Sequence, residues 1–371
     1  MQDNGAPAAN KAAQVISALR SVNFQAGPKL KDVHNFTNQL AVMIKAGINI
    51  RSAIEGVADQ VENVKFRKIL QQINSDVEGG QPFSEALAKH QKIFSPLYVN
   101  MVKASELSGN FGHMLDRIAA YLAQQIETRR MVRGAMIYPI IIGVTAVVTT
   151  VFLLTFVLPK FTVLFVGKDA LLPKPTVILM SLSGFMRNYW YVLIGGIVTL
   201  VFSFVQVTRT EVGRRYWDTI KLQIPIFKRM LRALYITRSM QTMGELINAG
   251  VPMLETLRIT SDVSNNYVYS QMWLVVHESV KSGNKVADTL TQTSLLPRSV
   301  VQMISSGEES GKLGAVLQDI SEYYAKELTS TIKTATAMIE PLMIVIMGVV
   351  VGFIAMSVVL PIFKLSSLVK Q

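Results

Sequence analysis

The chain has 371 residues, no cysteine and a formal charge of +12; half of the residues are hydrophobic and 17% are charged. The missing cysteine excludes disulfides, thiolate catalysis and cysteine-ligated metals, and the charged fraction is low for a soluble protein. The charge divides as +5 over residues 1–133, +3 over 134–208, +3 over 209–333 and +1 over the remainder. This even spread argues against a nucleic-acid-binding surface and favours anionic membrane lipid as a partner.

The first part of the chain predicts a tail followed by a helical domain. Residues 1–30 are rich in Ala, Gln, Asn and Ser and are interpreted as a mobile N-terminal tail. Residues 31–133 carry apolar side chains at three- and four-residue steps, which indicates about six helices and no strand. Gly47 follows the first helix as its C-terminal glycine, and Ser84 is expected to cap a short helix over residues 85–89.

A glycine-marked corner precedes the first membrane segment. In the sequence ASELSGNFG, residues 104–112, Gly109 and Gly112 separate two helices, and we expect the second to continue into the apolar segment 134–159. No charged residue occurs between Ala135 and Pro159, a length that spans a bilayer core of roughly 30 Å at about 1.5 Å per residue.

The remaining segments alternate between membrane and polar sequence. Residues 189–208 form a second apolar stretch that opens with the aromatic triplet Tyr189-Trp190-Tyr191, which is typical of a membrane interface. The full predicted order is a tail (1–30), a first cytoplasmic helical domain (31–133), a first membrane helix (134–159), an extracytoplasmic loop (160–188), a second membrane helix (189–208), a second cytoplasmic helical domain (209–333), a third membrane helix (334–363) and a short extracytoplasmic tail (364–371).

Much of this sequence occurs twice. With a shift of 202 positions, 20 of the 61 residues from Met101 to Phe161 are identical to those from Met303 to Phe363, without a gap. The chain is therefore a duplicated unit in which a helical domain leads into a membrane helix. We predict an all-α membrane protein with two homologous cytoplasmic helical bundles of about six helices each and three transmembrane helices. Candidate structural or coupling positions are Gly47, Glu106, Gly109, Gly112, Pro139 and Pro159 in the first copy, and Gly250, Glu308, Gly311, Gly314, Glu340, Pro341 and Pro361 in the second.

The recurring prolines predict the shape of the membrane helices. Pro139 and Pro341 each lie a few residues inside an apolar helix, where the lost backbone hydrogen bond favours a kink. Pro159 and Pro361 are interpreted as helix stops.

No motif of catalysis or cofactor binding emerges from the sequence. GEESGK at residues 307–312 fails as a phosphate loop, because only three residues separate its glycines and Leu313 replaces the required Ser or Thr. It is interpreted as a helical corner whose acidic pair lies near a helix N-terminus or meets a basic partner. The four histidines lack metal-ligand spacing, so we expect no catalysis, no cofactor and no metal. Glu340 is the one acid at a membrane boundary; a functional role and snorkelling to the headgroups are weighed equally.

Basic residues predict the orientation in the membrane. Arginines flank the predicted cytoplasmic ends of the first two membrane helices, whereas the loop between them has a weaker and more dispersed set. Both bundles and the N-terminus are therefore placed in the cytoplasm and the C-terminus outside. The candidate membrane-surface or partner contacts are Arg129, Arg130, Arg133, Arg209, Arg214 and Arg215.

With these motifs in view, the chain resembles the type II secretion system F family from about Lys31 to Phe363. The resemblance rests on F-x3-L-x6-G at 36–47, LQIPIFKRMLRALYITR at 222–238, SMQTMGELINAGVPMLETL at 239–257, GEESGKL at 307–313 and IEPLMIVIMGVVVGF with LPIF at 339–363. Two features of the first copy depart from the family pattern, namely ASELSG in place of a Gly-Glu pair and AGINI in place of Gly-x-Pro.

The resemblance implies a multi-pass inner-membrane platform protein of a type IV pilus or type II secretion machine, without catalysis. Its implied partners are a cytoplasmic hexameric ATPase, pilin or pseudopilin subunits, other inner-membrane assembly proteins, and further copies of itself. The competing hypotheses are a small secondary transporter built from a duplicated unit and a membrane-bound enzyme. Against the transporter, each repeat contributes one membrane helix in the same orientation; against the enzyme, the catalytic constellation is missing.

Overall fold

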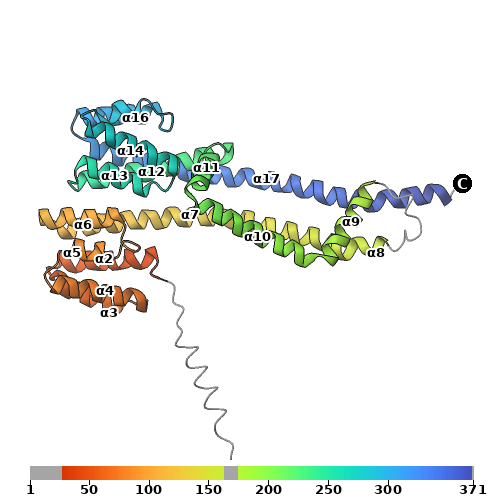
Figure 1. Cartoon of the computed structure of the whole chain (residues 1–371), viewed down its shortest axis with the longest axis horizontal. Helices are drawn as coiled ribbons and strands as arrows, with labels where there is room; N and C mark the ends of the chain where they lie inside the picture. Colours follow the sequence, from red (N-terminus) through yellow and green to blue (C-terminus); the bar gives the residue numbers. More distant parts are fainter. Residues whose placement is uncertain (1–26, 163–173, 370–371) are drawn as a thin grey trace, which may run out of the picture. The chain divides into compact units, whose positions relative to one another are not determined.

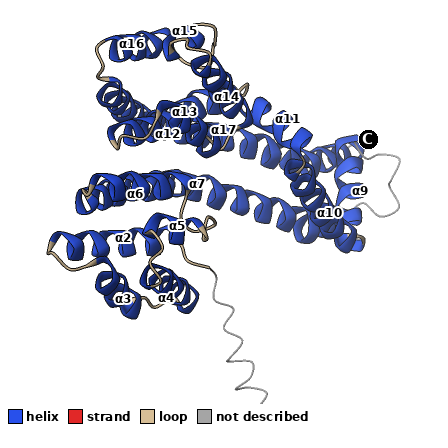
Figure 2. Ribbon diagram, turned by 60° about the vertical axis from the view of Figure 1, so that its left-hand side comes forward, coloured by secondary structure: helices blue, strands red, loops and turns tan. Residues whose placement is uncertain are grey.

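The computed structural model describes residues 27–162 and 174–369 and divides into two compact units. Unit 1 ends at Glu127 and also includes Glu245–Pro252, whereas unit 2 comprises Thr128–Gly244 and the chain from Met253 onward. Every regular element in the described part of the chain is a helix (Figure 2). The prediction of an all-α membrane protein with two homologous bundles is confirmed. Of the predicted N-terminal tail, residues 1–26 lie outside the described part.

Unit 1 is built from short helices that pack around an aromatic core. Phe36, Phe66, Phe94 and Tyr98 are buried, with ring centroids 5.9 Å apart for Phe36–Phe66 and 5.1 Å apart for Phe94–Tyr98. The Tyr98 hydroxyl lies 3.0 Å from Thr37 Oγ1, so the buried phenol has a polar partner. The helices are α2 (Leu30–Lys45), α3 (Ile50–Gln60), α4 (Val64–Glu78), α5 (Phe83–Ala88), α6 (Pro96–Ser108) and the first turns of α7 (Phe111–Phe152).

One predicted cap in this unit is wrong. The short helix α5 begins at Phe83 with Pro82 at its N-cap, so Ser84 lies inside the first turn. Its hydroxyl is engaged elsewhere, because it donates to the carboxylate of Glu106. Asn49 and Asn63 are the N-caps of α3 and α4, and each side chain accepts a hydrogen bond from the backbone of the helix that follows it.

Unit 2 contains the membrane helices and most of the second bundle (Figure 1). The fully buried Trp273 donates from Nε1 to Ser239 Oγ at 3.0 Å in the bundle. The further elements are the π-helical turn η1 (Leu153–Val157), α8 (Leu158–Thr162), α9 (Lys174–Asn188), α10 (Trp190–Arg209), α11 (Glu211–Lys221), α12 (Pro225–Asn248), α13 (Met253–Val263), α14 (Tyr267–Lys281), α15 (Val286–Leu290), α16 (Arg298–Glu309) and α17 (Leu313–Val369).

Three helices in the described residues are long and apolar enough to cross a membrane, as predicted. They lie within Phe111–Lys160, Trp190–Arg209 and Leu313–Ser357. The first and third contain the repeated prolines: α7 continues through Pro139 and α17 through Pro341.

One sequence interpretation of the membrane region is wrong. Pro159 and Pro361 do not end their helices, because α8 includes Pro159 and α17 continues past Pro361 to Val369. The physical cause lies in the contacts of α9, which occupies Lys174–Asn188 of the segment 160–188 and is described below; residues 163–173 lie outside the described part.

Candidate functional site

In each repeat, the glutamate just before the glycine-marked corner accepts hydrogen bonds from the N-terminus of a short helix. In the first repeat, the Glu106 carboxylate accepts hydrogen bonds from Ser84 N at 3.2 Å and from the Ser84 hydroxyl. In the second, Glu308 accepts from Val286 N at 2.9 Å and Ala287 N at 3.1 Å. The two short helices begin at Phe83 and Val286, which are 203 positions apart, so Ser84 corresponds to Ala287, the second N–H donor to Glu308. A carboxylate suits this position because helix N-terminal N–H groups lack internal partners and carry partial positive charge.

The corner turns have the same backbone conformation in both repeats. Gly109 and Gly311 have φ values of +72° and +69°, a left-handed conformation that strains other residues. Gly47 and Gly250, which end the first helices of the two repeats, match in the same way at +85° and +84°. The duplication seen in the sequence therefore extends to backbone geometry.

Small residues after the corners allow neighbouring helices to approach closely. A Cβ on Gly112 would lie 2.8 Å from Lys45 Cγ, in a region where Lys45 Nζ also lies 2.7 Å from Asp116 Oδ2. A Cβ on Gly244 of α12 would lie 3.3 Å from the Gly314 carbonyl oxygen on α17. The corner geometry is thus fixed by an acid, a left-handed glycine and a close helix contact in each copy.

Equivalent positions of the two repeats meet at the membrane boundary. The Tyr138 hydroxyl donates to Glu340 Oε1 at 3.0 Å, and these residues are related by the 202-residue shift. They border a groove of about 420 Å³ between α7 and α17. Its lining contains three repeat-related pairs: Met131 with Lys333, Ala135 with Ala337, and Tyr138 with Glu340.

The prolines at this level leave backbone carbonyls without their usual donors. Pro139 and Pro341 have no N–H for the carbonyls of Ala135 and Ala337, four residues earlier, and both alanines line the groove. The groove therefore combines an apolar wall with a carboxylate and two carbonyl groups that lack an i+4 partner. This arrangement suits contact with another helix better than covalent chemistry.

At the far end of the membrane helices, α9 supplies hydroxyl donors where the prolines cannot supply N–H groups. The carbonyl of Ser357 lies four residues before Pro361 and instead accepts from Thr176 Oγ1 at 2.7 Å. In the π-helical register of η1, the carbonyl of Leu154 would pair with residue 159, which is a proline. It accepts from Ser183 Oγ at 2.5 Å.

These two hydroxyls lie on one buried face of α9. Thr176 is 3% exposed and Ser183 5%, and Leu179 lies between them in a core with Leu154, Leu158 and Ile354. The helices continue through Pro159 and Pro361 because this face replaces the missing donors. We call the contact of Thr176, Leu179 and Ser183 with the proline-containing ends of the two helices the α9 clasp.

The predicted basic residues lie at exposed positions. Arg129, Arg130 and Arg133 are exposed on α7, and Arg209 is exposed at the end of α10. On α11, Arg214 Nε lies 3.9 Å from Asp218 Oδ2, and the Arg215 guanidinium lies 5.6 Å from the centroid of the Tyr267 ring.

A partly buried ion pair was missed by sequence reasoning. Arg117 of α7 lies 2.8 Å from Glu245 Oε2 on α12, within unit 1. Burial raises the pKa of the Glu245 carboxyl, and the adjacent Arg117 charge and hydrogen bond oppose that rise. Nothing in the local spacing of either residue signals this pair, because its partners are 128 positions apart.

The described residues contain no group of three or more His, Asp or Glu side chains that could hold a metal ion. Together, the repeated corners, the uninterrupted helices that follow them and the paired proline segments define a duplicated, multi-pass membrane protein. Residues 36–159 and 240–361 each match the family described as type II secretion system (T2SS), protein F. The chain belongs to this family.

Relatives in this family come from two kinds of machine. The chain is 39% identical to the type IV pilus assembly protein PilC of Thermus thermophilus over 348 residues, covering 94% of this chain and 86% of the relative. It is 36% identical to PilC of Myxococcus xanthus over 344 residues, covering 93% and 82%. It is 29% identical to the type II secretion system protein F of Vibrio cholerae over 348 residues, covering 94% and 86%.

Proposed function

We propose that this chain is a bacterial inner-membrane platform protein that couples a cytoplasmic hexameric ATPase to polymerisation of pilin or pseudopilin subunits. The names of the relatives support a place in such machinery. Of the two machines, we favour the type IV pilus, because the relatives cited at 39% and 36% identity are pilus assembly proteins.

The observation that carries the proposal is the continuity from each corner into the membrane. The helix α7 extends without a break over 42 residues, about 63 Å, from just after the Gly109 turn. Its counterpart α17 begins just after the Gly311 turn and continues for 57 residues. A displacement of a corner by a bound motor would therefore pass along a stiff helix into the bilayer.

The proposed orientation places the N-terminus and both bundles on the cytoplasmic side and the 160–188 segment and C-terminus outside. The exposed Arg129, Arg130 and Arg133 support this orientation, because basic residues are retained on the cytoplasmic side of membrane helices. Reporter fusions at the C-terminus and within residues 163–173 should be active only outside the cytoplasm. Cytoplasmic activity at both sites would contradict the orientation.

We further propose that the chain works as a homo-oligomer together with other inner-membrane assembly proteins. The apolar side chains of α10 are available to such neighbours as well as to lipid, since none of its residues is buried by the described part of the chain. Cross-linking in native membranes, followed by mass analysis, would identify which neighbours are bound.

An insertion in α7 tests the transmission step. Seven helix-forming residues inserted between Thr128 and Arg129 rotate the membrane end by only about 20° relative to the bundle, whereas seven Gly and Ser residues break mechanical continuity. In a strain that lacks its own copy, we expect the helical insertion to retain pilus output and the flexible one to abolish it. Both variants should still co-purify the ATPase. Full output from the flexible variant would contradict transmission through α7.

Co-purification separates the proposal from its competitor. A platform protein should bring down a hexameric ATPase and small proteins with apolar N-terminal helices. Substrate-dependent flux in liposomes containing this chain alone would instead establish a transporter.

A further inference from the structure

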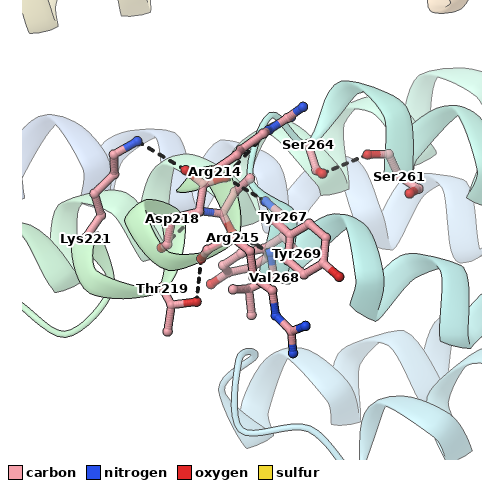
Figure 3. Close-up of polar contacts among 11 residues, drawn as sticks. Arg214, Arg215, Asp218, Thr219, Lys221, Ser261, Ser264, Tyr267, Val268 and Tyr269 are labelled. Carbon is pink, nitrogen blue, oxygen red and sulfur yellow. Dashed lines mark hydrogen bonds and ion pairs between the residues drawn. The ribbon is translucent and has the colours of Figure 1, made fainter. Parts of the chain in front are cut away.

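Helix α11 docks on the second bundle through its polar face. Asp218 is 4% exposed, and its Oδ2 accepts a hydrogen bond from the backbone N–H of Tyr267, at the start of α14, at 2.9 Å. Its Oδ1 accepts from Lys221 Nζ at 3.1 Å, and Asn266 Nδ2 donates to its backbone carbonyl at 3.4 Å. Figure 3 shows Asp218 between Lys221, Arg214 and the first residues of α14.

The apolar face of the same helix is left uncovered. Val212, Tyr216 and Ile220 recur at four-residue steps, so they form one stripe, and they are 67%, 68% and 45% exposed. On a helix with 3.6 residues per turn, Asp218 lies on roughly the opposite side from this stripe. A surface helix of a soluble domain is normally oriented the other way, with its apolar side against the core. Because the apolar stripe of α11 faces away from the bundle, we expect an apolar partner outside the chain to cover it.

Helix α11 also lies close to the end of a membrane helix. Only Thr210 separates it from α10. The Trp217 ring packs edge-on against Phe204 of α10, with centroids 4.9 Å apart. Phe204 precedes Arg209 by five residues, about 7.5 Å along the helix axis. The helix therefore folds back beside the last turns of α10, which form the Arg209 end of that candidate membrane span.

The charges on this segment fit an anionic membrane surface. Residues 209–221 contain four basic side chains and two acids, a net charge of +2, and the acid Asp218 faces the bundle with Lys221 and Arg214 beside it. Helices that lie in the interface pair an apolar stripe with flanking Lys and Arg in this way.

We propose that α11 is an interfacial helix that inserts Val212, Tyr216 and Ile220 into the bilayer surface at the Arg209 end of α10, with anionic lipid as its partner. Asp218 fixes the rotation of the helix about its axis, so the stripe faces the lipid while the polar side holds the bundle. The second bundle is thereby attached to the membrane surface by a contact other than α17. This inference rests on α10 crossing the membrane and not on coupling to an ATPase.

The natural absence of cysteine allows a direct test in the full-length chain. Single cysteines introduced as Val212→Cys, Tyr216→Cys and Glu278→Cys are spin-labelled after reconstitution into nanodiscs of phosphatidylcholine with phosphatidylglycerol. Glu278 is the control because it is exposed on α14 of the same bundle. We expect labels at 212 and 216 to collide several-fold less with a water-soluble nickel complex than the label at 278, and more with oxygen.

Equal nickel accessibility at the three positions would overturn the proposal. A second copy of the chain could cover the stripe instead. In that case the label at 216 would show spin–spin broadening, and in nanodiscs that hold a single copy the broadening would disappear and nickel accessibility would rise. Replacing phosphatidylglycerol with phosphatidylcholine should raise nickel accessibility at 216, and an unchanged value would refute the preference for anionic lipid.

Discussion

The α9 clasp gives the sharpest prediction of stability. Thr176→Val keeps the shape of the side chain but removes the hydroxyl that donates to the Ser357 carbonyl. Side-chain hydrogen bonds within membranes are worth about 0.6 kcal/mol on average, because each partner usually finds another. The usual helical donor to the Ser357 carbonyl, the N–H four residues later, is missing because that residue is Pro361. We therefore expect a cost nearer that of an unsatisfied buried carbonyl, about 1–2 kcal/mol.

A second substitution isolates the cause. Pro361→Ala restores an N–H four residues after Ser357, so the carbonyl no longer depends on Thr176. In the Pro361→Ala background, Thr176→Val should cost about 1 kcal/mol less than in the natural sequence, which is a coupling energy within the range seen for contacting residues. Ser181→Ala is the matched control on the same helix, because Ser181 is exposed and its hydroxyl bonds only within α9.

The measurement is the free energy of unfolding of the full chain in mixed micelles, by titration with a denaturing detergent. Ser183→Ala should behave like Thr176→Val, since it removes the donor to Leu154. The explanation is refuted if Thr176→Val costs the same with and without Pro361, or if Ser181→Ala costs as much as either clasp variant.

Three further predictions concern the bundles and the membrane boundary. Glu308→Gln should lower bundle stability by about 1 kcal/mol, because its carboxylate accepts two N–H groups of α15; the exposed Glu309→Gln is the thermal-unfolding control. Arg117→Met should cost about 1–3 kcal/mol near neutral pH by leaving Glu245 buried without its partner, whereas Glu245→Gln should cost less. Because burial raises the folded-state pKa of Glu245, stability should fall as pH rises from the unfolded to the folded pKa, and Glu245→Gln should remove that slope in a pH series. Glu340→Gln should weaken pilus output if the acid at the groove is functional, and normal output with normal assembly would leave it a structural partner of Tyr138.

The sequence predicted the features that depend on composition and repetition. Three apolar stretches were enough to predict three membrane helices, and the 202-residue shift related Glu106 to Glu308 before any contact was known. The positive φ values of Gly109 and Gly311 follow from turn chemistry that is local to each glycine.

The features that the sequence did not predict depend on partners far along the chain. The rule that proline ends a helix assumes that no other donor is available, and in this protein Thr176 reaches a carbonyl 181 positions away. The spacing of Thr176, Leu179 and Ser183 on one helical face was the available signal, but Arg187 concealed it in a segment interpreted as a loop. The orientation of α11 likewise depends on Asp218 meeting Tyr267, which is 49 positions later.

The two membrane contacts between the repeats have a joint mechanical consequence. Tyr138 and Glu340 connect α7 and α17 at one level, and the α9 clasp connects their proline-containing ends at another. Pro139 and Pro159 mark these levels on the first repeat and are twenty residues, about 30 Å, apart. We expect helices held at both ends of a bilayer-length segment to stay together when only one contact is lost. Under the proposed function, we expect a force applied through either bundle to act on the pair of helices, and only loss of both contacts, as in Tyr138→Phe combined with Thr176→Val and Ser183→Ala, to let one repeat move without the other.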